Sequence, residues 1–148
     1  MLIHSMLSVG LSVYLAAPSL TQTQMDAEAY VKSAVAYAKT NGVYKLIKDV
    51  NAPTTPWKKG ELYIFIIDMD GVVMGHGANA KLVGKDLSER EDSGSVRYIQ
   101  EFIKLANDKG SGWVDYQFTN PETGKIEAKT TFVEKVDMVI IGCGVYKK

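Results

Sequence analysis

The stretch that decides the fold runs from Glu61 to Gly77 and reads ELYIFIIDMDGVVMGHG. Its first half is rich in Ile, Tyr and Phe, and such near-continuous apolarity predicts a strand covered on both faces. Asp70 and Gly71 tolerate the positive φ angles of a two-residue hairpin turn. We therefore expect Val72 to Gly75 to return antiparallel to the first strand, which starts an antiparallel sheet.

The same motif allows a second interpretation. An apolar run followed by D-x-D-G resembles the opening of haloacid-dehalogenase-like phosphatases, in which Asp68 would be the nucleophile and Asp70 the acid/base. Those enzymes also need a Ser or Thr, a Lys and further acids that hold magnesium, carried on successive strands of a parallel sheet. After Gly71 the chain offers one helix and three strands, which cannot complete such a sheet. We therefore expect turn chemistry at both aspartates and no enzymatic activity, with the phosphatase as the alternative.

Two helices precede the decisive stretch. From Met25 to Thr40, apolar or small residues recur at intervals of three and four, which predicts an amphipathic helix; they are Ala27, Tyr30, Val31, Ala34, Val35 and Ala38. Asn41 and Gly42 interrupt this pattern, and residues 43–50 repeat it over a shorter stretch. Residues 51–60 contain Pro53 and Pro56 and predict a loop.

The part after the hairpin predicts a long loop, one helix and three strands. Residues 75–91 form the loop, and the helix is capped by Ser93 or Ser95 and ends at Gly110. Strands are expected over 113–119, 128–136 and 138–145, with a turn at 121–124. The predicted fold class is α+β, a five-stranded antiparallel sheet with the N-terminal helices packed on one side and a long loop plus helix over the other side.

Composition limits the function classes. A chain of 148 residues with 46% apolar residues forms one domain. Lys plus Arg equals Asp plus Glu at 17 each, so no basic field favours nucleic acid. The single cysteine, Cys143, lies in an apolar run and predicts a buried thiol. With His4 near the N-terminus and His76 without a His or Cys neighbour, we expect no metal site and no cofactor.

The first residues differ from the rest of the chain. Residues 1–24 have an apolar centre shorter than a membrane span, then small residues and a polar exit, which predicts a signal peptide. This segment contains no Lys or Arg, so an uncleaved anchor or a different start codon stays open. We expect the domain to cover residues 25–148 and to be periplasmic or secreted.

The chain resembles the single Cache domains, which are extracytoplasmic sensor folds related in shape to PAS domains. The resemblance covers Tyr30 to Tyr146 and rests on the order of several short segments: WKKGELYIF at 57–65 leading into DMDG at 68–71, MGH at 74–76, LVGKDL at 82–87, GWVDY at 112–116, KTTFV at 129–133 and GCGVY at 142–146. One departure is Gly77, where the family often has Pro.

This resemblance implies that a small organic molecule, typically a short carboxylate or an amino acid, binds between the sheet and the long loop plus helix above it. It implies sensing without chemistry on the ligand, and a signal passed to an unknown partner. The first amphipathic helix is also a candidate surface for a homodimer.

The candidate site residues centre on the hairpin that turns at 121–124. Counting back along both strands places Tyr116 opposite Lys129 and Val114 opposite Thr131 on one face, which makes Tyr116, Lys129 and Thr131 candidate ligand contacts. An ammonium beside a phenol is a receptor for a carboxylate through charge-assisted hydrogen bonds. The alternative is an ordinary exposed cross-strand pair.

The remaining candidates surround this pair. His76, at the mouth of the long loop, is a candidate hydrogen-bond donor or an ordinary loop residue. Phe65, Met74 and Trp113 are candidate apolar walls, with Trp113 turned inward by a bulge at Gly112. Arg97 would clamp a carboxylate if it faced the sheet, but its position on the helix favours solvent.

Overall fold

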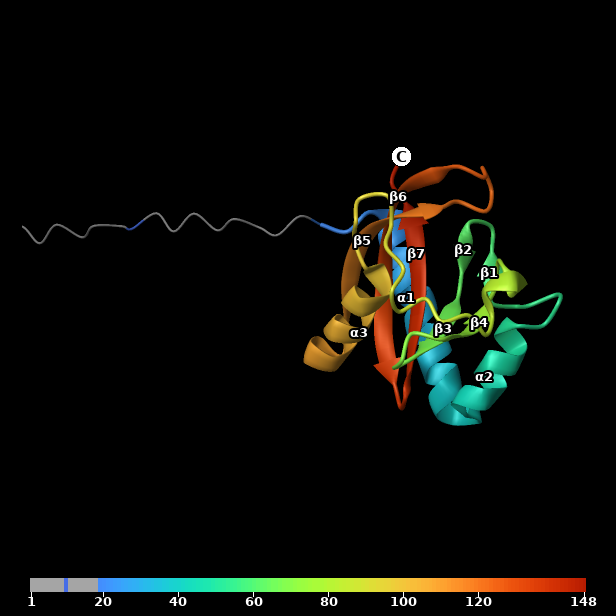
Figure 1. Cartoon of the computed structure of the whole chain (residues 1–148). Coiled ribbons are helices and arrows are strands. Elements are labelled where there is room, and N and C mark those ends of the chain that lie inside the picture. The colour runs from blue at the N-terminus through green and yellow to red at the C-terminus, as the bar shows by residue number, and fades with distance from the viewer. Residues whose placement is uncertain (1–9, 11–18) are drawn as a thin grey trace, which may run out of the picture.

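The computed structural model describes residues 10 and 19–148 of the chain (Figure 1). Most of the predicted signal peptide therefore lies outside the described residues. Helix α1 spans Gln22–Asn41 and begins before the predicted Met25. A capping box explains the earlier start of the helix. The Thr21 side chain accepts a hydrogen bond from the backbone amide of Gln24, and the Gln24 side chain accepts one from the backbone amide of Thr21. Helix α2 spans Val43–Val50, as expected. None of the described helices is long and apolar enough to cross a membrane.

The main sheet has five strands in the order β4-β3-β7-β6-β5, and every neighbouring pair is antiparallel. This confirms the predicted fold class and is incompatible with the parallel sheet that the phosphatase alternative needs. The strands are β3 Phe65–Asp68, β4 Val73–His76, β5 Ser111–Thr119, β6 Ile126–Val136 and β7 Val139–Tyr146. A two-stranded ribbon, β1 Lys58–Lys59 with β2 Leu62–Tyr63, also forms partly inside the predicted loop.

The turn between β3 and β4 differs from the predicted two-residue hairpin. The backbone pairs Asp68 with Val72, which leaves Met69, Asp70 and Gly71 as the loop. The Asp68 Oδ1 atom accepts from the amides of Asp70 and Val72, each at 2.9 Å, and Gly71 has a φ of 93°. The side chain of Asp68 thus closes a longer turn, which is the turn chemistry expected for this aspartate.

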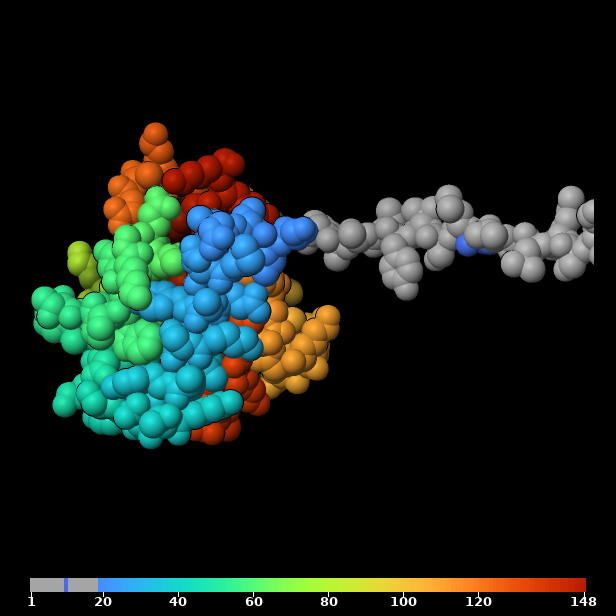
Figure 2. All heavy atoms as spheres, turned by 180° about the vertical axis from the view of Figure 1, so that it is seen from behind, coloured from blue at the N-terminus to red at the C-terminus, as the bar shows by residue number. Residues whose placement is uncertain are grey.

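Helices cover both faces of the sheet. On one face α1 and α2 bury the predicted stripe of α1 against Ile64 and Ile66, and Figure 2 shows these helices covering that side. On the other face α3, Tyr98–Lys109, and the loop with the 3-10 helix η1, Ala80–Leu82, lie over Phe65 and Ile67 (Figure 1). Because the apolar stripe of α1 is buried on the sheet, a homodimer would have to use the outer face of this helix.

Helix α3 begins later than the predicted caps at Ser93 and Ser95. The Asp92 carboxylate accepts from the amides of Gly94 and Val96, and Ser95 has a φ of 62°. These residues form a separate turn, so the helix starts at Tyr98.

Candidate ligand-binding site

Lys129 lies in the middle of β6, opposite Tyr116 on β5 and Tyr146 on β7. Its side chain is buried, with 1% of the residue exposed, so the alternative of a solvent-exposed pair is wrong. The Nζ atom donates to the Tyr63 hydroxyl at 2.7 Å and lies 4.6 to 5.0 Å from the centres of the Tyr63, Phe118 and Tyr146 rings. These aromatic rings favour a cation through their π faces.

No carboxylate lies within ion-pair distance of Lys129 among residues 19–148. Burial disfavours the charged amine and lowers its pKa from 10.5 to about 7. The structure therefore holds a buried amine that has aromatic neighbours and one hydroxyl partner but no anion.

His76, at the end of β4, is buried against Tyr63, with ring centres 4.9 Å apart. Its Nδ1 atom accepts from the backbone amides of Ala78 at 3.2 Å and Asn79 at 2.8 Å. Burial, with a smaller contribution from the charge of Lys129, lowers the pKa of His76 to about 3. The imidazole is therefore neutral, and because Nδ1 is an acceptor its proton resides on Nε2 as a donor.

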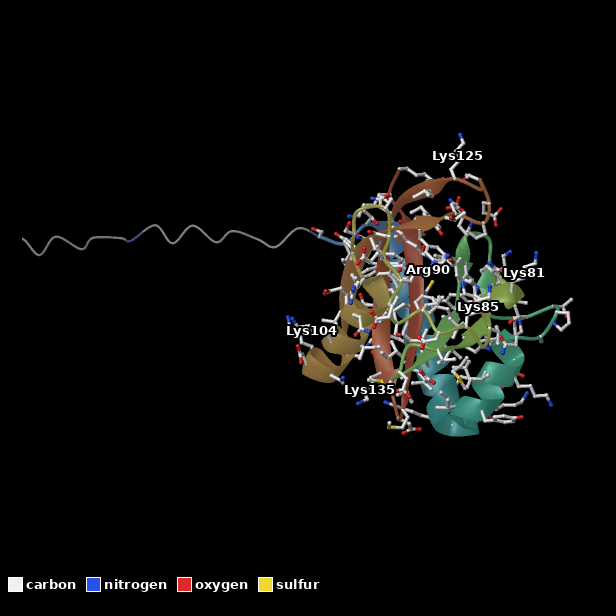
Figure 3. The ribbon with its side chains drawn as sticks, in the orientation of Figure 1. Lys81, Lys85, Arg90, Lys104, Lys125 and Lys135 are labelled. Atoms are coloured by element: carbon white, nitrogen blue, oxygen red, sulfur yellow. The ribbon has the colours of Figure 1, made fainter. Side chains whose placement is uncertain are left out.

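These groups line an inner chamber of about 30 Å³ that is otherwise apolar; its lining includes Tyr63, Phe65, Ile67, Val73, His76, Leu82, Leu87, Ile99, Tyr116, Phe118 and Lys129. An outer vestibule of about 380 Å³ shares Tyr63, His76, Leu82 and Phe118 with the chamber. The vestibule is more polar and includes Asn79, Arg90, Asp92 and Gln117; Figure 3 labels Arg90 in the loop before α3. Together the two cavities form a concave region with apolar walls and a few polar groups, which is the usual form of a small-molecule site.

The structure brings four of the predicted site residues together, since Phe65, His76, Tyr116 and Lys129 all line the chamber. The predicted register of Tyr116 with Lys129 and of Val114 with Thr131 is confirmed. The Tyr116 hydroxyl, however, bonds Thr131 Oγ1 at 3.0 Å rather than Lys129. Thr131 is fully buried and is not among the residues that line the chamber, so the expectation that it contacts the ligand was wrong; its hydroxyl bonds Tyr116 instead.

Met74 and Trp113 do not line the chamber, and the expectation that they do was wrong. A register shift in the β3–β4 pairing pairs Ile66 with Gly75 and Ile67 with Val73, which leaves Met74 on the α1 side. The pairing of β5 with β6 runs without interruption past Gly112, so no bulge turns Trp113 inward. Trp113 instead packs on the ring of Phe132 on the α1 side.

Tyr63 is the functional residue that the sequence prediction missed, together with Phe118 and Tyr146 as walls around Lys129. The alternation of side chains in a strand could have identified Tyr63 and Phe118, because residues two positions apart point to the same face of a sheet. Tyr63 precedes Phe65 by two positions and Phe118 follows Tyr116 by two.

The other candidates take structural roles. Arg97 is exposed and pairs with Glu89 and Glu91, consistent with the expected solvent position. Cys143 is buried, and burial raises its pKa to about 12. No cluster of three potential metal ligands occurs in the described part of the chain.

The family model for the Cache domain matches residues 17–148. The chain belongs to the Cache domain family. Among curated proteins, this Cache domain is 34% identical over 86 residues to the methyl-accepting chemotaxis protein McpP of Pseudomonas putida, a match that covers 57% of this chain and 16% of McpP. The chain thus spans about a sixth of the length of that relative.

Solved structures share the fold of this Cache domain. A periplasmic sensor domain of a chemotaxis protein has a TM-score of 0.65 at 24% identity, with 84% of this chain and 90% of that chain covered. A Cache chemosensory domain studied for carboxylic acid recognition has a TM-score of 0.71 at 23% identity, with coverage of 85% and 94%. A methyl-accepting chemotaxis protein from Vibrio parahaemolyticus has a TM-score of 0.72 at 21% identity, with coverage of 84% and 88%. These similarities give no support to the phosphatase alternative.

Proposed function

We propose that this Cache domain is an extracytoplasmic sensor that binds a short organic carboxylate and signals through a partner, without chemistry on the ligand. The observation that carries the proposal is Lys129, an amine with 1% exposure and, among residues 19–148, no carboxylate partner. A buried charge that lacks a counter-ion costs several kcal/mol. A ligand carboxylate in the chamber would supply the missing anion.

Three polar groups line the chamber in which that carboxylate would bind. The ammonium of Lys129 has protons beyond the one donated to Tyr63, and His76 carries Nε2–H. The Tyr63 hydroxyl also interacts with the Tyr146 hydroxyl and would have to turn its proton toward the ligand. Hydrogen bonds from such groups to a carboxylate are charge-assisted and are stronger than neutral ones. Phe65 and Tyr116 contribute apolar walls.

The acidic residues of the vestibule favour a simple carboxylate over an amino acid. Glu91 pairs with Arg97, and the Asp92 carboxylate accepts from the backbone amides of Gly94, Val96 and Gln117. Both acids are therefore engaged within the domain. A ligand ammonium would have to compete for them, whereas a ligand without an amine would not.

The chamber also limits the length of the ligand. Its volume of about 30 Å³ leaves room for only a very small group beside Lys129, such as the carboxylate end of a ligand, unless the surrounding side chains move. A longer ligand would have to extend into the vestibule. Two similar structures support this choice, one a periplasmic sensor domain and one studied for carboxylic acid recognition. They also support the periplasmic or secreted location expected from the leader.

A thermal-shift and calorimetry screen with acetate, propionate, lactate and alanine tests the proposal, with propionamide as the uncharged control. A ligand at one hundred times its dissociation constant adds about 2.7 kcal/mol of stability. We expect a shift with propionate and none with propionamide. Lys129→Met should lose the response, and Lys135→Met, an exposed lysine on the same strand, should keep it. Equal responses to propionate and propionamide would refute the proposal.

A further inference from the structure

Lys129 combines three features that together make a reactive amine. It is fully buried, it lines a chamber of about 30 Å³, and none of the carboxylates in residues 19–148 forms an ion pair with it. Buried lysines lose their proton readily, which is why proteins use them as nucleophiles and bases. The carboxylate-binding role uses only the ammonium form of this residue and leaves the free amine without a function.

We propose that Lys129 is a carbamylation site, at which the free amine adds carbon dioxide reversibly inside the inner chamber. The nitrogen lone pair forms a C–N bond to the carbon of CO2, and one C=O electron pair moves onto oxygen. The nitrogen then releases one proton to water in the vestibule. The products are one carbamate anion and one proton, and no oxidant or reductant takes part.

The chamber suits this reaction in size and polarity. Carbon dioxide has three heavy atoms and no net charge, so it enters an apolar space of about 30 Å³ without the desolvation cost of an anion. The carbamate that forms is an anion and needs donors. The Tyr63 hydroxyl lies 2.7 Å from Nζ, and the Nε2–H group of His76 lines the same chamber.

The ionisable groups around Lys129 leave its amine free to react near neutral pH. They are Tyr63 on β2, His76 on β4, Tyr116 on β5, and Cys143 and Tyr146 on β7. Burial raises the pKa values of the three phenols and of the thiol, and lowers that of His76 to about 3, so all five groups are neutral. No fixed negative charge holds the proton on Lys129, whose pKa of about 7 gives a large fraction of free amine at pH 8.

Carbamylation would change what the chamber binds. It replaces a cation with an anion, so a carbamylated domain would repel the carboxylate that the ammonium attracts. Carbon dioxide would therefore act as an antagonist of carboxylate binding at this site.

Chemical trapping tests the proposal on the wild-type chain. The protein is incubated at pH 8 with ¹³C-labelled bicarbonate, carbamates are esterified with triethyloxonium, and labelled residues are located by peptide mass spectrometry. The α-amino group, with an ordinary pKa of about 7.7 to 8.0, is the positive control for trapping. We expect label on Lys129 at least tenfold above that on the exposed Lys135, and more label at higher dissolved CO2. Absence of label on Lys129 while the α-amino group is labelled, or equal label on Lys129 and Lys135, would overturn the proposal.

Variants and competition separate this proposal from the carboxylate-binding function. A ¹³C NMR signal from the carbamate should vanish in Lys129→Met and remain in Lys135→Met. The trapping experiment locates the label in the wild-type protein, so the assignment of the carbamate to Lys129 does not depend on how the variant folds. Propionate should lower the label on Lys129, since both need the same chamber. If propionate binds and the label is unchanged, the carbamate proposal stands and the site assigned to the carboxylate is wrong.

Discussion

Replacing Lys129 with Met should stabilise the free protein while removing its ligand response. The two side chains have similar length, and Met leaves no charge in the chamber. The fall in the pKa of Lys129 from 10.5 to about 7, at 1.36 kcal/mol per unit, corresponds to a cost of about 5 kcal/mol for burying the ammonium. This shift is the net result of all interactions of the ammonium, including its contacts with Tyr63 and the aromatic rings. We therefore expect a gain of up to about 5 kcal/mol in the free energy of unfolding for Lys129→Met at pH 6.

The pH dependence of this gain identifies its cause. The pKa of Lys129 is lower in the folded state than in the unfolded chain, so between pH 7 and 10.5 the unfolded state binds more protons. The wild-type protein then gains stability as pH rises through this window, while Lys129→Met lacks that gain. The advantage of the variant should shrink by about 3 kcal/mol between pH 6 and pH 9, to less than half of its size at pH 6.

Urea denaturation of the wild type, Lys129→Met and Lys135→Met at both pH values measures this difference. Contributions from all other titrating groups cancel between wild type and variant, provided that the two sites are independent. The control Lys135→Met should change stability by less than about 0.5 kcal/mol, as expected for an exposed position. A variant that is less stable than wild type at pH 6, or whose advantage is equal at pH 6 and pH 9, would show that no buried charge is being removed.

Three further predictions concern the same chamber. The affinity for propionate should fall about tenfold per pH unit above pH 7, because the Lys129 amine must take up a proton to bind an anion. Calorimetry in buffers of different ionisation enthalpy should reveal this proton uptake, and propionate binding without proton uptake would contradict the role of the amine. Tyr63→Phe should weaken propionate binding by about 1.5 to 3 kcal/mol, whereas Tyr44→Phe, at a residue that is 82% exposed, should leave the calorimetric affinity unchanged. Gly144→Ala would bring a Cβ atom closest to Thr131 Oγ1 and also to within 2.5 Å of Lys129 Cε, and it should destabilise the domain by about 1 to 3 kcal/mol in urea. Gly94→Ala, with its nearest contact at 3.4 Å, should not, and equal effects would argue against tight packing around Thr131 and Lys129.

The features that local patterns determine were predictable from the sequence. The six buried positions of α1 follow from the helical period alone. The pairing of Tyr116 with Lys129 follows from counting back from one turn, because register in a hairpin is set by its loop. Both inferences need only residues close together in the chain.

The features that depend on distant segments were not predictable. Tyr63 reaches Lys129 across 66 positions of sequence, and no local pattern indicates which hydroxyl meets a buried amine. Met74 faces α1 rather than the chamber because the pairing of the short strands β3 and β4 contains a register irregularity. A regular alternation of side chains along the strand cannot anticipate such an irregularity. The start of α3 was misplaced because Asp92, rather than a serine, satisfies the backbone amides before the helix.

The position of His76 connects the chamber to the loop above it. The Nδ1 atom accepts from the amides of Ala78 and Asn79, which begin the segment leading to η1, and Leu82 and Leu87 of that segment line the chamber. A ligand that accepts from Nε2 would therefore contact the sheet through Lys129 and the loop through its apolar side chains at the same time. A ligand shifts an equilibrium only by contacts that differ between two states. The sheet is fixed by ladders on both sides of Lys129, so for the proposed carboxylate we expect any displacement in the segment from residue 77 to α3 rather than in the sheet. The face covered by α1 and α2 has its own apolar core and takes no part in lining the chamber, which favours the loop and α3 as the elements that respond to a ligand at Lys129.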